Sequence, residues 1–118
     1  MVHRLKNWIL LRDIMCSNHR EAKFLIVEAY KEMTKVVGLV PTPPINEDIV
    51  SKMINNLGCV ISQDGFEAGL TLWRQDLSQL FKCPGECYYF EEFLGELDRM
   101  LQNLKETMSE KHQLQEEF

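Results

Sequence analysis

The stretch FEAGLTLWRQDLSQLFK, residues 66–82, carries the clearest structural signal in the chain. Its large apolar side chains follow one another at intervals of three or four residues: Phe66, Leu70, Trp73, Leu77, Leu80 and Phe81. Apolar residues at this spacing share one face of an α-helix, whereas polar residues such as Glu67, Arg74 and Gln75 fall on the opposite face. The segment therefore predicts an amphipathic helix with one side packed in a core.

The sequence before this helix predicts a second one. Residues 46–57 repeat the apolar spacing, with Asn46 as the N-cap and Gly58 in the position where a left-handed residue commonly ends a helix. We expect a short link over residues 59–62, with Ser62 capping the helix that follows.

The sequence after residue 82 predicts one long helix over residues 88–118. Its apolar seam consists of Phe90, Phe93, Leu94, Leu97, Met100, Leu101, Leu104 and Met108. Beyond Met108 the pattern is reduced to Leu114. We therefore expect the C-terminal end, from about residue 109, to project into solvent or fray unless a partner covers it.

The N-terminal part of the chain supplies two further helical patterns. Residues 5–15 fit a short helix, although a strand over residues 8–11 remains an alternative. A longer helix over residues 22–37 follows an N-cap at Ser17 or Asn18. Because this helix has apolar residues on more than one face, we expect it to be central and to contact several neighbours.

Together these patterns predict an all-α fold, a compact bundle of about five helices with a long C-terminal helix. With 118 residues, the expected organisation is a single helical domain over 1–118. The third to fifth helices should form consecutive antiparallel hairpins. The predicted centre of the core consists of Ile26, Met33, Phe66, Leu70, Trp73, Leu77, Phe93, Leu97 and Leu101.

The formal net charge of −5 disfavours general nucleic-acid binding, which needs a surplus of Lys and Arg. The charge is uneven: residues 1–38 carry +3 from seven bases and four acids, and residues 83–118 carry −6 from three bases and nine acids. This asymmetry could draw the N-terminal helices onto the C-terminal one, or hold two copies head to tail.

The sequence favours an intracellular protein, cytoplasmic or nuclear. No apolar run approaches the roughly 18 to 20 residues that span a bilayer, and Arg12 and Asp13 interrupt the N-terminal apolar run, so neither a membrane segment nor a signal peptide is expected. In a reducing compartment the four cysteines are expected to be thiols.

The segment around Cys83 and Cys87 has one structural and three chemical interpretations. A local disulfide would close a very small loop and would therefore restrict the unfolded chain little. A zinc site needs four ligands, and the remaining cysteines and histidines form no second close pair. A redox motif normally has two residues between its cysteines, and here there are three. The favoured interpretation is a tight turn at Pro84 and Gly85 that joins two helices. A zinc- or thiol-dependent protein built on Cys83 and Cys87 remains an alternative.

A nucleic-acid-binding regulator is the second alternative. The candidate basic patch comprises Arg4, Lys6, Arg12, Arg20 and Lys23. Trp8 would be its stacking group. The competing interpretation places Trp8 in the core and pairs these bases with the acidic C-terminal helix. Residues 46–75 also resemble a helix-turn-helix, but Asp64 and Glu67 at the start of its second helix would repel phosphate.

The sequence contains no recognisable nucleotide-binding, zinc-protease or EF-hand motif and no nucleophile placed beside a base. The leading hypothesis is therefore a small non-enzymatic adaptor or regulator, of the compact kind found in viruses and mobile elements. It would need no cofactor, and it would bind another protein or a second copy of itself through helical surfaces. The candidate protein-binding residues are Tyr88, Tyr89, Glu106, Met108, Glu110 and Leu114.

Overall fold

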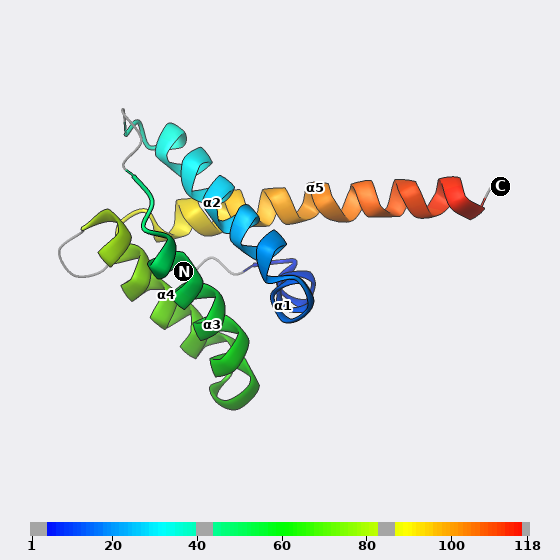
Figure 1. Cartoon of the computed structure of the whole chain (residues 1–118). Helices are drawn as coiled ribbons and strands as arrows, with labels where there is room; N and C mark the ends of the chain where they lie inside the picture. Colours follow the sequence, from blue (N-terminus) through cyan, green and yellow to red (C-terminus); the bar gives the residue numbers. More distant parts are fainter. Residues whose placement is uncertain (1–4, 40–43, 83–86, 117–118) are drawn as a thin grey trace.

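Over the residues that the structure describes, the protein is an all-α bundle of five helices, as the sequence predicts (Figure 1). The computed structural model describes residues 5–39, 44–82 and 87–116, with side chains at 5–39, 44–57, 65–82 and 87–109. The helices are α1 (Trp8–Ser17), α2 (His19–Val36), α3 (Glu47–Asp64), α4 (Phe66–Phe81) and α5 (Phe90–Glu116). Residues 8–11, for which a strand was an alternative, begin α1.

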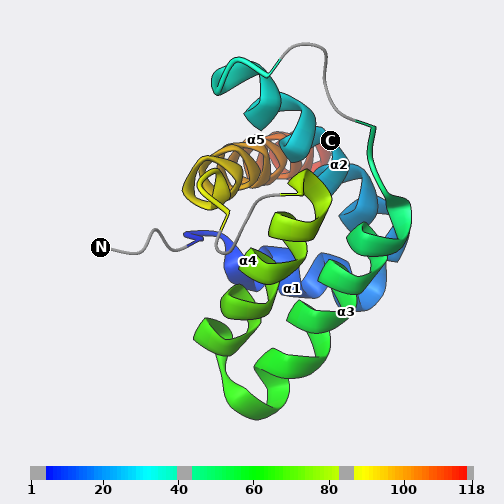
Figure 2. The same ribbon diagram turned by 90° about the vertical axis from the view of Figure 1, so that its left-hand side faces the viewer.

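Two helix pairs, α3 with α4 and α2 with α5, build the body of the molecule. Helices α3 and α4 lie side by side and antiparallel, and α5 runs across this pair (Figures 1 and 2). Helix α2 rests on α5 and also contacts α1 and α3. The central place predicted for the second helix is thus confirmed.

The expected hairpin of α3 and α4 is confirmed, but the expected hairpin of α4 and α5 is wrong. Helix α5 packs mainly on α2 and crosses α4 steeply (Figure 2). Its contacts with α4 lie near its beginning: Trp73 meets Phe93 at a ring-centroid distance of 5.9 Å, and Arg74 lies 4.7 Å from the centre of the Phe90 ring. An apolar seam specifies that a helix face is buried, but it does not specify which neighbour covers that face.

Asparagine side chains begin two of the helices. Asn18 accepts a hydrogen bond from the backbone N–H of Glu21 at 3.1 Å, and Asn46 accepts one from the N–H of Asp48 at 3.0 Å. These bonds satisfy backbone donors that have no partner within the helix. Both predicted N-caps are therefore confirmed, with Asn18 rather than Ser17 at the start of α2.

The predicted boundary at Gly58 is wrong. Helix α3 passes through Gly58, the expected link at 59–62 and the expected cap Ser62, and it ends at Asp64. The break is at Gly65, where φ is 94° and ψ is 168°, a backbone conformation that is essentially restricted to glycine. A glycine inside a helix costs only about 1 kcal/mol relative to Ala, which the packing of α3 on α4 can offset.

The core contains almost all of the residues predicted for it. Ile26, Met33, Leu70, Trp73, Leu77, Phe93, Leu97 and Leu101 are buried. Phe66 is half-buried at the edge of the core, where its ring lies 5.0 Å from that of Trp8. Tyr30 is also fully buried, and desolvation raises the pKa of its hydroxyl group.

Polar contacts join α3 to α4 as well. The indole Nε1 of Trp73 donates a hydrogen bond to the carbonyl oxygen of Met53. The carboxylate of Asp76, which is buried, accepts a hydrogen bond from Asn56 at 2.6 Å and lies 3.4 Å from the ammonium group of Lys52. Since a buried carboxylate needs partners, these contacts fix the register of the hairpin.

Candidate protein-interaction surface

The C-terminal part of helix α5 is not packed in the core. Leu101 is fully buried and Leu104 is half-buried, whereas Lys105, Glu106 and Met108 are exposed. The C-terminal part of the helix extends beyond the other helices (Figure 1). It accounts for a radius of gyration of 14.9 Å, larger than the roughly 13.5 Å typical of a compact chain of this length. The burial of the seam thus ends at Leu104, and the side chains of residues 105–109 are exposed. The expectation of a projecting or frayed end from about residue 109 stays a prediction.

The N-terminal segment is anchored to α5 just before this point. The backbone N–H and the side-chain amide of Asn7 donate to Oδ1 of Asp98 at 3.2 and 3.3 Å. The same amide lies 3.4 Å from Oε1 of Gln102. Asn7 and Asp98 are both buried, so these bonds stabilise the position of α1 beside the exit of α5.

A groove of about 380 Å³ lies between α1 and α5 next to this anchor. Its walls are formed by Lys6, Asn7, Ile9, Leu10, Asp13 and Lys105. Ile9 is 60% exposed although it is strongly apolar, and Met108, one turn beyond Lys105 on α5, is 53% exposed. Apolar side chains with flanking charges are typical of protein-binding surfaces. We call Lys6, Ile9, Leu10, Leu104, Lys105 and Met108 the α1–α5 surface.

Ile9 was not predicted to be a surface residue, because it belongs to the apolar residues from which the short helix over residues 5–15 was predicted. In the structure the buried residues of α1 are Leu11, Ile14 and Met15. Position 9 does not lie three or four residues from any of these buried positions. The sequence spacing therefore already indicated that Ile9 is not on the buried face of α1.

The predicted protein-binding residues that the structure describes do not form one site. Tyr88 is 80% exposed, but Tyr89 is half-buried with its ring 5.6 Å from that of Phe81. The span from Phe90 to Met108 is roughly 27 Å along the helix axis, so the tyrosines and Met108 lie far apart. Glu106 is exposed near Met108. The side chains of Glu110 and Leu114 lie outside the described residues.

The predicted basic patch is also divided. Lys6 lines the groove beside α5, whereas Arg20 and Lys23 line a separate cavity of about 370 Å³ between α2 and α3. Arg12 lies over the ring of Trp8 at 5.1 Å, and this ring packs on Phe66. Arg4 lies outside the described residues. Trp8 is thus part of an internal stack, which argues against its use as a platform for bases.

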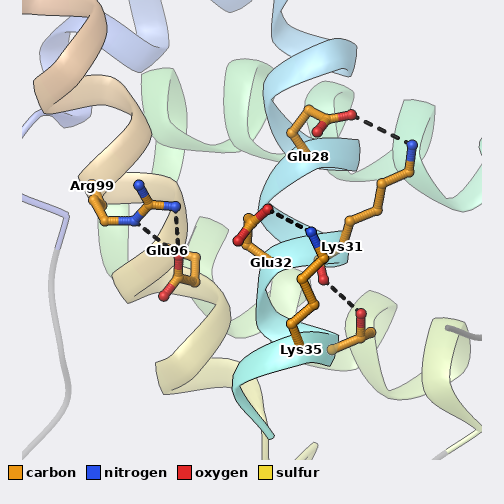
Figure 3. A network of polar contacts seen from close by, with 7 residues as sticks. Glu28, Lys31, Glu32, Lys35, Glu96 and Arg99 are labelled. Carbon is orange, nitrogen blue, oxygen red and sulfur yellow. Dashed lines mark hydrogen bonds and ion pairs between the residues drawn. The ribbon is translucent and has the colours of Figure 1, made fainter. Parts of the chain in front are cut away.

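The expected pairing of N-terminal bases with the acidic C-terminal helix is wrong for the residues that the structure describes. Figure 3 shows three ion pairs that form within α2 or within α5: Lys31 with Glu28, Lys35 with Glu32 and Arg99 with Glu96. Within the described ranges no ion pair joins α1 or α2 to α5. Pairing within a helix satisfies the charges locally, because residues three apart are neighbours on its surface.

The zinc and thiol alternative is not tested, because Cys83, Pro84 and Gly85 lie outside the described residues. Cys87 is buried and Cys16 is exposed, and both are free thiols. In the described part of the chain, no three His, Cys, Asp or Glu side chains converge as metal ligands would. Among the described residues, none of the helices is both long and apolar enough to span a membrane.

Comparison of the chain with models of known protein families, with curated proteins and with solved structures finds no match.

Proposed function

We propose that this chain is a non-enzymatic protein-binding module, an adaptor or regulator that binds its partner through the α1–α5 surface. One observation carries the proposal: α5 continues past the core and presents Met108, 53% exposed, beside a groove in which Ile9 is 60% exposed. The exposed free thiol of Cys16 favours a reducing, intracellular compartment, cytoplasmic or nuclear.

The physical basis is the combination of apolar and charged groups at one place. Burial of Ile9 and Met108 by a partner would remove apolar surface from water, which is the main driving force of association. Lys6 and Lys105 flank these side chains and would select an acidic partner over a basic one. The groove is at the small end of the range for ligand pockets, which suits side chains from a helix laid across it.

The test is a comparison of three single variants. Ile9→Glu and Met108→Glu each place a charge on the proposed surface, and Phe24→Glu does the same on α2, where Phe24 is 62% exposed. Tagged chains would be used to recover bound proteins from nuclease-treated extracts of the cells that express the protein. We expect the first two variants to lose about tenfold or more of the partner, and Phe24→Glu to retain it.

Circular dichroism should show the same helical content in all three variants, because the replaced side chains are exposed. Equal recovery of partners by all variants would contradict the proposal. If the unmodified chain recovered proteins from an untreated extract but none from a nuclease-treated one, the result would favour the nucleic-acid alternative instead.

A further inference from the structure

The C-terminal part of α5 has properties that complement the groove beside it. From Lys105 to Glu116 the helix is roughly 18 Å long and uninterrupted. Residues 106–118 contain four acids and one base, a net charge of −3. Met108 is the exposed apolar side chain of this segment that the structure describes. We call residues 106–118 the tail.

The groove has the opposite character. Lys6 and Lys105 give it two positive charges against the single negative charge of Asp13, and Ile9 and Leu10 give it an apolar floor. The tail of the same chain cannot fill it, because α5 is continuous to Glu116 and leads away from α1 (Figure 1). An acidic helix that fills this groove would therefore come from another molecule.

We propose that the occupant of the groove is the tail of a second copy of this chain, so that the protein is a dimer in which two tails are exchanged. This inference rests on the proposed function, because it uses the α1–α5 surface and names its partner. Lys105 both lines the groove and directly precedes the tail. A two-fold axis that passes near Lys105 and is oriented across α5 would place each tail over the groove of the other copy.

The reciprocal arrangement limits the assembly to a dimer. In a two-fold interface both molecules use the same surface, so no binding site remains for a third copy. Met108 of each chain would lie against Ile9 and Leu10 of the other, and the acidic tail would approach Lys6. The charges at the rim are screened within about 8 to 10 Å at physiological ionic strength, so the dimer should weaken as salt rises.

The first experiment is sedimentation equilibrium of the purified full-length chain. We expect a concentration-dependent mass that reaches twice the monomer mass of 13.9 kDa. Ile9→Glu and Met108→Glu should each raise the dissociation constant about tenfold or more, and the exposed control Phe24→Glu should leave it unchanged. Raising salt from about 50 mM to about 500 mM should weaken the dimer of the unmodified chain severalfold.

The second experiment identifies which surfaces meet. Two single variants, Ile9→Cys and Met108→Cys, would be made with the native cysteines replaced by Ala, given tags of different size, and mixed under mild oxidation. Exchange of tails predicts that disulfide-linked products joining position 9 of one chain to position 108 of the other predominate. Circular dichroism and the mass of each variant would establish that it still folds and associates.

The outcomes separate this inference from the proposed function. A monomer at all concentrations would overturn the exchanged dimer, while loss of another partner by Met108→Glu would still support the α1–α5 surface. Linkage mainly between two positions 108 would show that the tails pair with each other, and would overturn their place in the groove. If neither self-association nor partner recovery responds to Ile9→Glu or Met108→Glu, both proposals fail.

Discussion

Trp73 is the largest side chain that the fold buries completely. Its indole group packs edge-on against Phe93 at 5.9 Å and donates a hydrogen bond to Met53, so one residue connects α4 to both α5 and α3. Its place in the apolar stripe predicted its burial. The acceptor for its N–H group was not predictable, because that acceptor is a backbone carbonyl of another helix, 20 residues away in the chain.

Trp73→Ala is expected to lower the free energy of unfolding by about 3 to 5 kcal/mol, because it leaves a cavity in the core and removes a hydrogen bond. Tyr88→Ala is the matched aromatic control, since Tyr88 is 80% exposed and should contribute little. Urea unfolding followed by far-ultraviolet circular dichroism would measure both. An unchanged midpoint for Trp73→Ala would mean that Trp73 lies on the surface.

At the scale of elements, Gly65 decides where α3 ends and α4 begins. No other residue lies between the two helices, and the required φ of 94° is unfavourable for any residue with a Cβ atom. Gly95, by contrast, lies within α5 with no atom within 4 Å of the place where a Cβ would be. The two glycines therefore allow a comparison of a turn and a helix interior by the same substitution.

Gly65→Ala should destabilise the protein by about 1 to 3 kcal/mol, because Ala would have to adopt a strained backbone or shift the hairpin. Gly95→Ala should stabilise it by about 0.5 to 1 kcal/mol, because Ala has the higher helix propensity and fits without a clash. The unfolding temperature should therefore fall for Gly65→Ala and rise for Gly95→Ala, relative to the unmodified chain. A gain in stability from Gly65→Ala would show that the turn tolerates a side chain.

The whole molecule consists of a packed body and a projecting tail. All described side chains of the tail, residues 106–109, are exposed, so the tail contributes little burial to the body. The anchor of Asn7 to Asp98 and Gln102 lies before the tail and would survive its removal.

A chain that ends at Lys105 is therefore expected to keep its fold. Its unfolding free energy should differ from that of the full chain by less than about 1 kcal/mol, the effect of removing surface residues. Its mass in solution should become that of a monomer, because the proposed dimer contact is lost. Cooperative unfolding at a much lower temperature would show instead that the tail supports the body, and that its loss cannot be interpreted as loss of an interface alone.

Local sequence determined where most of the helices lie and most of the residues that they bury. The three- and four-residue spacing depends on the geometry of a single helix, as does the capping by Asn18 and Asn46, so both are visible without the fold. The weakening of the apolar seam beyond Met108 predicted a projecting or frayed end from about residue 109, whereas the burial of α5 already ends at Leu104. Glycine residues were weaker predictors of helix ends. Gly58 and Gly65 are the same residue type, and only the backbone conformation that each adopts in the fold distinguishes them.

Only the tertiary structure decided which buried faces meet. The sequence did not indicate that α5 would pack on α2 and cross α4, because any apolar seam can cover another and the choice depends on the packing of all the helices together. It also did not indicate that Ile9 and Lys105, 96 positions apart, would line one groove, since no local rule connects them. The candidate site arises from that long-range arrangement, whereas its individual residues are ordinary parts of two helices.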